Sequence, residues 1–326
     1  MYLIHLSPLH AISSKKRLAQ VLNTDTTTLR QLIKQLHSSD IPYKEFSEKK
    51  NGKTRDIQNP FPALKKIQKR IKKLLSRITT PEWLISGKKG ISYPDNGRYH
   101  QKNKIITCLD IHSFYQHVEQ KYVLGFFLND LQMTSDVAGV LTDLVMFPRG
   151  KQHWHLPTGA PSSQIIAFWA FHTLFERLHQ LARNRGIKMS LYVDDITLSS
   201  SKPIPPAFIN LFRNAIASFG LSLKTQKIKR YGVSASKEIT GCILTPRGHL
   251  RVPNKLRKKL FKLLGSKSIE ELDFDTLEKS YGILNSARQI EPHLFPVLYA
   301  KIGQRFKNLR PFQKKYQKQY NHKQKV

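Results

Sequence analysis

The amino-acid sequence predicts an α+β fold, with an antiparallel sheet near the middle of the chain and helices on either side of it. Two short apolar segments, Met189–Tyr192 and Ile196–Ser199, are separated by only three residues, which is the pattern of paired antiparallel strands. Apolar residues at spacings of three or four follow Pro62–Ile78 and indicate an amphipathic helix. From Asn254 onward the sequence has helical periodicity. A chain of 326 residues with 40% apolar residues is long enough for two or three packed subdomains.

The N-terminal third of the chain alternates helical and strand-like segments. Ser14–His37 has the pattern of short helices. Lys44–Pro60 is polar and rich in lysine, with Asn51–Gly52 as the expected turn of a β-hairpin. In the helix expected at Pro62–Ile78, the positions outside the apolar stripe are basic. This basic face is either a solvated surface or a contact with a nucleic-acid backbone. Membrane binding is a weaker interpretation, because the apolar face lacks interfacial aromatic residues beyond Phe61.

The rest of the chain continues this alternation. The segments expected here are, in order, a buried strand at Lys104–Asp110, a long helix at Ser163–Arg185, a helix at Pro206–Phe219, a hairpin of Lys237–Leu244 with His249–Val252, and a disordered basic tail at 314–326. The two imidazoles of His153–Trp154–His155 have no third ligand at zinc-like spacing, so this stretch is expected to be an exposed loop.

The charge of the chain points to a polyanionic partner. Lys and Arg total 55 against 22 Asp and Glu, which gives a formal net charge of +33. A surplus of this size repels itself in a compact fold unless a polyanion lies against it, so nucleic acid is the leading partner. Cys108 and Cys242 are too few for a disulfide framework. No apolar run approaches the ~20 residues of a membrane span, and Met1–Leu9 lacks the pattern of a secretion signal, so we expect a soluble, intracellular protein that binds a polyanion and no membrane.

Three aspartates form the most informative cluster. Asp110 ends one predicted strand, and Asp194 and Asp195 lie in the turn between two others. Adjacent carboxylates in a tight turn repel each other unless a divalent cation neutralises them. Mg²⁺ prefers oxygen ligands and is usually held by one or two carboxylates together with substrate phosphates. Two such ions can activate an attacking hydroxyl and stabilise the leaving oxygen at phosphorus, so the cluster predicts phosphoryl-transfer chemistry with two Mg²⁺ ions.

Five segments resemble the motifs of reverse transcriptases, in the order that the family has them. Tyr192–Val193–Asp194–Asp195 is similar to the YxDD signature. The other four are the fingers segment Lys53–Pro60, the first palm motif Asp110–Tyr115, the template- and nucleotide-positioning loop Leu156–Ser163, and Lys227 after Gly220–Leu221. The resemblance implies a right-hand polymerase fold with fingers, an antiparallel-sheet palm and a helical thumb.

The resemblance also implies where these parts begin and end. We expect the N-terminal helices and fingers at residues 1–103, the palm at 104–252 with a fingers insertion around 116–155, and the thumb at 253–313. The tail at 314–326 follows. The part from Arg251 onward carries 18 basic and 6 acidic residues, and no acid follows Glu291.

Two further motifs narrow the resemblance to retron reverse transcriptases. Asn96–Gly97–Arg98–Tyr99–His100 resembles their NAxxH motif, with Gly97 in place of alanine, and Ile239–Thr240–Gly241 resembles their VTG motif, with isoleucine in place of valine. The chain also ends soon after the expected thumb, which is a further retron-like trait. The residues expected to bind RNA are Asn96, His100, Ile239, Thr240 and Gly241, together with the basic thumb residues Lys255, Arg257, Lys258 and Lys259.

The resemblance implies nucleotide-binding roles for residues around the aspartates. Lys53 and Arg55 would grip the incoming triphosphate through charge-assisted contacts. Tyr115 would lie under the sugar and exclude a 2′-hydroxyl, unless its ring is simply packed in the core. Gly159 suits a backbone that approaches a base pair closely, and Lys227 matches the lysine of the next palm motif.

The implied activity is RNA-directed DNA synthesis, in which a primer hydroxyl attacks the α-phosphate of a deoxynucleoside triphosphate. Asp110 and Asp194 would bind the two Mg²⁺ ions, with the Ile111 carbonyl as a further ligand and Asp195 assisting. The retron likeness implies a structured non-coding RNA template, a guanosine 2′-hydroxyl primer, a branched multicopy single-stranded DNA product, and a role in anti-phage defence beside an effector protein. Two alternatives stay open: a reverse transcriptase of another retroelement that uses a 3′-hydroxyl primer, and a non-catalytic RNA-binding scaffold.

Overall fold

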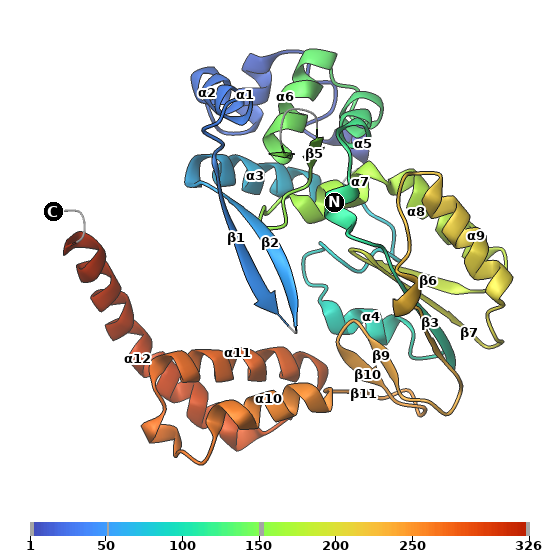
Figure 1. Cartoon of the computed structure of the whole chain (residues 1–326), viewed down its shortest axis with the longest axis vertical. Helices are drawn as coiled ribbons and strands as arrows, with labels where there is room; N and C mark the ends of the chain where they lie inside the picture. The colour runs from blue at the N-terminus through green and yellow to red at the C-terminus, as the bar shows by residue number, and fades with distance from the viewer. Residues whose placement is uncertain (1–2, 51, 150–152, 324–326) are drawn as a thin grey trace. The chain divides into compact units, whose positions relative to one another are not determined.

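The computed structural model describes residues 3–50, 52–149 and 153–323, which form two compact units (Figure 1). The first unit combines Met1–Ser92 with Ile105–Arg230, and the second combines Tyr93–Lys104 with Tyr231–Val326. Each unit is therefore built from two separate stretches of the chain. The second unit groups residues on both sides of the predicted boundaries at 104 and 253, and the division into fingers, palm and thumb at those positions stays a prediction.

The first unit begins with short helices and a long hairpin. Its elements up to residue 75 are η1 (Ile4–Leu6), α1 (Lys15–Val21), α2 (Thr26–Leu36), β1 (Tyr43–Lys50), β2 (Lys53–Pro60) and α3 (Pro62–Leu75). Ser14 and Asp25 cap α1 and α2, because their side chains accept hydrogen bonds from the backbone N–H groups of the first helical turn. Strands β1 and β2 pair antiparallel up to Lys50↔Lys53, which confirms the predicted β-hairpin. Asn51 lies outside the described residues, and Gly52 has a φ of +73°.

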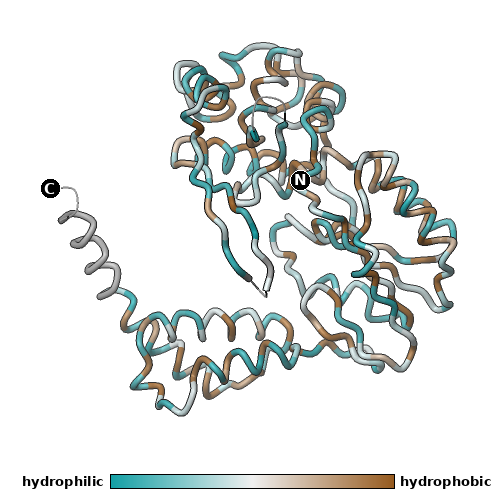
Figure 2. Tube along the Cα trace, viewed as in Figure 1, coloured by the Kyte–Doolittle hydropathy of each residue, from teal (hydrophilic) through white to brown (hydrophobic). Residues whose placement is uncertain are grey.

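Helix α3 has the amphipathic pattern that the sequence predicts. Pro62 lies at its start, where the missing N–H costs no hydrogen bond. The apolar stripe from Leu64 to Leu75 is buried, whereas Lys66, Lys69 and Lys73 are exposed. Along the described chain, hydrophilic and hydrophobic residues are interspersed and do not gather into separate segments (Figure 2). In the part of the chain that the structure describes, no helix has an apolar stretch long enough to cross a bilayer.

A four-stranded sheet with the order β6-β7-β3-β8 carries the three aspartates (Figure 1). Its strands are β3 (Ile105–Asp110), β6 (Lys188–Tyr192), β7 (Asp195–Ser200) and β8 (Lys229–Tyr231). Strands β3 and β6 both pair antiparallel with β7, as predicted. The register places Asp110 directly opposite Asp195, so the two side chains point to the same face of the sheet.

Further elements complete the first unit. They are η2 (Phe114–His117), α5 (Gln120–Gly125), the π-helical turn η3 (Phe126–Asp130), α6 (Ser135–Val145), β4 (Phe147–Arg149), β5 (His153–His155), α7 (Ser163–Ala170), α8 (His172–Arg183), α9 (Pro206–Ala217) and η4 (Thr225–Lys227). Helices α8 and α9 lie side by side, and α8 packs against β6 (Figure 1).

The prediction of a single helix at Ser163–Arg185 is wrong, because the helix is divided into α7 and α8 at Phe171. Phe171 has φ −120° and ψ 20°, outside the helical region. Its side chain is fully buried and contacts the rings of Phe114, Tyr122 and Phe219. Tertiary packing of this ring therefore outweighs the helical periodicity of the sequence around it.

The prediction of an exposed loop at His153–His155 is also wrong. These residues form β5, which pairs with β4 so that Trp154 lies opposite Pro148. The side chains of Trp154 and His155 are buried, and this desolvation lowers the pKa of His155. The imidazole of His155 lies against the ring of Phe147, with the two ring centroids 5.4 Å apart. His155 therefore belongs to the packing of a small β-hairpin, whereas His153 is exposed as predicted.

The second unit combines one short helix, a small sheet and a bundle of helices. Its elements are α4 (Tyr93–Tyr99), β9 (Lys237–Ile239), β10 (Cys242–Leu244), β11 (Leu250–Arg251), α10 (Asn254–Leu264), η5 (Ile269–Glu271), α11 (Phe274–Ile290) and α12 (Pro296–Lys323). The sheet has the order β11-β10-β9. Leu260, Leu277, Leu284 and Ile302 form the buried core of the helical part.

Two details of the second unit differ from the predictions. The strand predicted at Lys237–Leu244 is two strands, which reverse at Thr240–Gly241. Both residues have positive φ, +41° and +85°, as the two central residues of a type I′ hairpin turn require. Helix α12 continues to Lys323, through most of the tail predicted to be disordered. That segment lacks glycine and is rich in lysine and glutamine, which favour helix. Residues 324–326 lie outside the described part.

Candidate active site

The turn between β6 and β7 holds Asp194 in a strained backbone. Tyr192 pairs with Asp195, so Val193 and Asp194 form a two-residue turn. Val193 has a φ of +61°, which is rare for a β-branched residue and costs on the order of 1–3 kcal/mol. Two hydrogen bonds hold the turn: the Val193 N–H donates to Ser86 Oγ at 3.0 Å, and the Ile111 N–H donates to the Asp194 carbonyl at 3.0 Å. The end of β3 and the turn are therefore fixed to each other.

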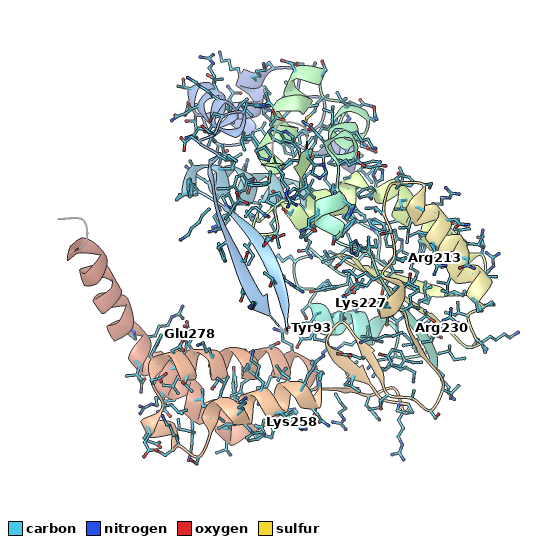
Figure 3. The ribbon with its side chains drawn as sticks, viewed as in Figure 1. Tyr93, Arg213, Lys227, Arg230, Lys258 and Glu278 are labelled. Carbon is cyan, nitrogen blue, oxygen red and sulfur yellow. The ribbon has the colours of Figure 1, made fainter. Side chains whose placement is uncertain are left out.

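Two lysines neutralise Asp110 at the end of β3. Lys224 Nζ lies 2.6 Å from Asp110 Oδ1, and Lys227 Nζ lies 2.7 Å from Oδ2 (Lys227 is labelled in Figure 3). The backbone N–H of Lys224 also donates to the Asp110 carbonyl at 2.8 Å. Lys227 is one of the residues expected from the sequence, but Lys224 is not. Its only sequence signal is its spacing of three residues before Lys227.

When all three are ionised, Asp110, Asp194 and Asp195 carry one more charge than Lys224 and Lys227 offset. Burial raises the pKa of Asp110, but the two ammonium groups outweigh it and hold the pKa below its usual range. Burial, followed by the charge of Asp110, raises the pKa of Asp194. Burial and the charges of Asp194 and Asp110 together raise the pKa of Asp195 to about 7. A cation placed among these groups would relieve both the desolvation and the repulsion.

The carboxylates of Asp110 and Asp194 are suitable ligands for Mg²⁺. In the described residues, no three His, Cys, Asp or Glu side chains are already arranged around one metal position. Asp110 and Asp194 supply carboxylate oxygens from two neighbouring elements, and Mg²⁺ commonly takes one or two carboxylates, with substrate phosphates and water as its other ligands. The carbonyl of Ile111 as a further ligand stays a prediction.

A cavity of about 610 Å³ brings together most of the residues expected to bind the nucleotide. Arg55 from β2, Tyr115 from η2, Asp194 from the strand turn and Lys227 from η4 all line it, and so does Lys224. Burial raises the pKa of Tyr115, so its hydroxyl stays protonated at neutral pH. The backbone of Lys53 belongs to β2, but its side chain lies outside the described part of the structure.

Gly159 lies where the loop after β5 touches the β1–β2 hairpin. A Cβ at this position would lie 2.5 Å from the Gln58 carbonyl oxygen and 2.9 Å from its carbon. The N–H of Thr158 donates to Gln58 Oε1 at 3.2 Å, which joins the loop to β2. The close approach in the structure is therefore to the protein's own strand, and an approach to a base pair stays a prediction. Sequence reasoning did not identify Gln58 or Ser86.

We expect Gly159→Ala to destabilise the protein and to lower polymerase activity. The added methyl group meets backbone atoms that cannot rotate away, so β2 must shift, at a cost of about 1–3 kcal/mol. Gly97→Ala is the matched control, since its Cβ meets only the tip of the Leu250 side chain and alanine favours helix α4. Thermal unfolding measures both variants, and equal melting temperatures would contradict the role assigned to Gly159.

The Ile239–Gly241 motif contacts helix α4, which carries most of the Asn96–His100 motif. Thr240 Oγ1 donates to the carbonyl of Tyr93 at 3.1 Å, and Tyr93 in turn donates to the carbonyl of Ser286 on α11 at 2.8 Å (Tyr93 is labelled in Figure 3). The side chains of Asn96, His100 and Ile239 are fully buried. They lie in the interior of the unit, and their role in RNA binding stays a prediction.

The four basic residues predicted to bind RNA from the thumb fall into two groups in the structure. Arg257 points to Glu291, with Nη2 2.8 Å from Oε1, and Lys255 pairs with Glu238. Lys258 and Lys259 are exposed on α10 (Lys258 is labelled in Figure 3). The last two are therefore the better candidates for contacts with a phosphate backbone.

Comparison with known proteins identifies the family. The family model described as "Reverse transcriptase (RNA-dependent DNA polymerase)" matches residues 47–267. The Se72 retron reverse transcriptase of Salmonella heidelberg is 30% identical over 71% of this chain and 61% of its own length. The Ec86 retron enzyme of Escherichia coli is 27% identical over 74% of this chain and 72% of its own, and the Ec73 retron enzyme is 22% identical over 89% and 96%.

A more distant likeness is found among solved structures. A telomerase from Candida albicans, in complex with a fragment of telomeric RNA, aligns with 80% of this chain and 56% of its own, with a TM-score of 0.48 and 12% identity. This likeness is too weak to bear on function. The family match covers more than half of the chain and confirms the right-hand polymerase fold predicted from the sequence. The chain thus belongs to the reverse transcriptase family, and the three relatives named above are retron enzymes.

Proposed function

We propose that this chain is an RNA-directed DNA polymerase that copies a structured non-coding RNA into single-stranded DNA. One observation carries the proposal: Arg55, Tyr115, Asp194 and Lys227 from four separate elements line one cavity, beside Asp110. The cavity would therefore hold the phosphates and the sugar of a nucleotide next to a pair of carboxylates. The family match and the basic charge of the chain support the same activity.

The side chains of the cavity would divide the work of nucleotide addition. Arg55 would bind the triphosphate through paired N–H donors. Asp110 and Asp194 would hold two Mg²⁺ ions, which when bound supply an activated attacking hydroxyl and a neutralised leaving oxygen. Lys224 and Lys227 would keep Asp110 ionised and oriented, since both contact its carboxylate. Asp195 would assist from the opposite strand position, and Tyr115 would lie against the sugar.

The template, primer and biological role follow from the retron likeness. We propose that the cognate RNA is encoded nearby, that a guanosine 2′-hydroxyl of this RNA serves as primer, and that the product is a branched RNA–DNA molecule. We further propose a role in anti-phage defence with an effector protein. The retron-like motifs and the names of the relatives support this proposal.

Two measurements test the proposal together. Nucleic acid that co-purifies with the protein is sequenced, and the purified protein is assayed for Mg²⁺-dependent primer extension. A single-stranded DNA joined to one RNA species by a 2′–5′ bond is the expected result. DNA synthesis from a 3′-hydroxyl primer alone would favour another retroelement enzyme, and RNA binding without synthesis would favour a scaffold.

We expect the double variant Lys258→Ala, Lys259→Ala to weaken the salt dependence of RNA binding. Removing one ion pair between a lysine and a phosphate should reduce the slope of log affinity against log salt concentration by about 0.7 to 0.9. Lys121→Ala, at an exposed lysine of α5, is the control. Binding is measured from low to moderate salt, and identical slopes for wild type and double variant would mean that this face of α10 is only solvated.

A further inference from the structure

A cavity in the second unit lies apart from the residues assigned above to catalysis. Its volume is about 550 Å³, and it is lined by residues of α4, of β11 and of the loop between α11 and α12. Sites that hold small ligands have volumes of roughly 300–1,000 Å³. The cavity therefore has room for a single nucleotide.

Two arginines give this cavity a basic lining. Arg98 is 42% exposed, and its guanidinium donates to Asp95 Oδ1 at 2.8 Å and to the Gln289 carbonyl at 2.7 Å. Arg251 is 58% exposed and lies 3.3 Å from Glu291 Oε2. A guanidinium has five N–H donors, more than either arginine uses in the described part of the chain. Both side chains are thus held in place with donors left for a phosphate group.

The acid at this cavity is neutralised by its own neighbours. Glu291 Oε1 accepts from the Val252 N–H at 2.6 Å and from Arg257 Nη2 at 2.8 Å, and its other oxygen faces Arg251. Burial raises the pKa of Glu291, but these donors outweigh it and lower the pKa. Arg98, Arg251 and Arg257 together carry one more charge than their partners Asp95 and Glu291, so a net positive charge remains at the cavity.

An aromatic residue with an unusual backbone completes the lining. Phe295 has a φ of +46°, in the left-handed region that aromatic residues rarely adopt. Its half-buried ring packs edge-on against the ring of Phe261, with the centroids 5.3 Å apart, and lies 5.9 Å from the guanidinium of Arg257. His293 is exposed two residues earlier. Backbone strain is common where a side chain is held for a ligand, and aromatic rings bind unpaired bases by stacking.

We propose that this cavity binds one unpaired nucleotide of an RNA, with the base against Phe295 and His293 and the phosphate against Arg98 and Arg251. Structured RNAs present such nucleotides in bulges and loops, where proteins recognise them by stacking. The inference rests on the proposed function, which makes RNA the partner, and deepens it by naming how one feature of that RNA is recognised. A free nucleoside monophosphate carries the same base and phosphate as an unpaired nucleotide of an RNA. The test therefore distinguishes binding of an RNA bulge from binding of a free nucleotide.

The test compares an RNA hairpin with one bulged adenosine, the same hairpin without the bulge, and AMP, each titrated into the full-length protein. Wild type is expected to bind the bulged hairpin more tightly. Phe295→Gly suits the left-handed backbone and removes the ring, so it should reduce this preference on the order of tenfold. Arg251→Ala should reduce it similarly, whereas Phe295→Tyr keeps the ring and should keep the preference. Arg213→Ala, at an arginine of α9 in the first unit (Figure 3), is the matched control.

Several outcomes would overturn the inference. Equal affinity of wild type for both hairpins would do so, as would a full preference for the bulge in both Phe295→Gly and Arg251→Ala. Tight binding of AMP without a preference for the bulge would make the cavity a site for a free nucleotide. Melting temperatures identify a variant that loses the preference through unfolding, and the decision then rests on the other variant. Primer extension by wild type is measured separately, so a failed polymerase assay contradicts the proposed function and leaves the binding result interpretable.

Discussion

Asp194→Asn and Asp195→Asn are each expected to abolish DNA synthesis, by about 10²- to 10³-fold or more, while RNA binding changes little. We propose that the carboxylates hold the metal ions and expect the affinity for RNA to come from the basic surface. Single-turnover primer extension with Mg²⁺ measures the first effect, and a binding titration measures the second.

The raised pKa values of Asp194 and Asp195 predict how these two variants affect the stability of the protein. Because burial and neighbouring charges raise the pKa of both carboxyl groups, a neutral asparagine removes repulsion and should not lower the melting temperature. Asp275→Asn, at an exposed residue of α11, is the matched control and should leave activity unchanged. Extension at the wild-type rate by both active-site variants would refute the metal assignment.

Tyr115→Ala is expected to relax sugar discrimination, raising ribonucleotide incorporation relative to deoxyribonucleotide incorporation by on the order of a hundredfold. The ring lines the same cavity as Arg55 and Asp194, where a sugar would lie between the triphosphate and the base. Competing incorporation of the two nucleotide types measures the effect.

Tyr115→Phe separates a steric role from a role of the hydroxyl, because it keeps the ring and should keep the discrimination. The alternative is that Tyr115 only packs beside Phe114, whose ring centroid lies 6.1 Å away. In that case Tyr115→Ala would lower the melting temperature and leave sugar selection unchanged.

Local patterns predicted much of the fold. Each strand of the aspartate turn, the β1–β2 hairpin and helix α3 is fixed by contacts close in sequence, so periodicity and turn residues identify them. The division at Phe171 could not be predicted, because it depends on aromatic rings from three distant parts of the chain. The burial of Trp154 and His155 likewise depends on pairing with β4.

In the candidate site, too, residues in short sequence motifs could be predicted, whereas residues that depend on contacts distant in sequence could not. Asp110, Asp194, Tyr115 and Lys227 were predicted because they belong to short motifs, and the structure brings them to one place. Lys224, Ser86 and Gln58 act through single contacts with residues far away in sequence, and no local pattern identifies them. The buried positions of Asn96 on α4 and of His100 directly after it also depend on packing that the sequence does not encode locally.

The interleaving of the two units has a consequence for synthesis and for dissection of the protein. Tyr93–Lys104 leaves the ribosome before Ile105–Arg230, but the segments on which it packs, such as Leu250 and Ser286, come later still. The second unit therefore closes only after a long loop is formed, which slows folding and leaves the buried face of α4 open to aggregation in the meantime. For the same reason neither unit can be isolated by cutting the gene once: a fragment ending at Arg230 carries α4 without its partners, and a fragment beginning at Tyr231 carries the partners without α4.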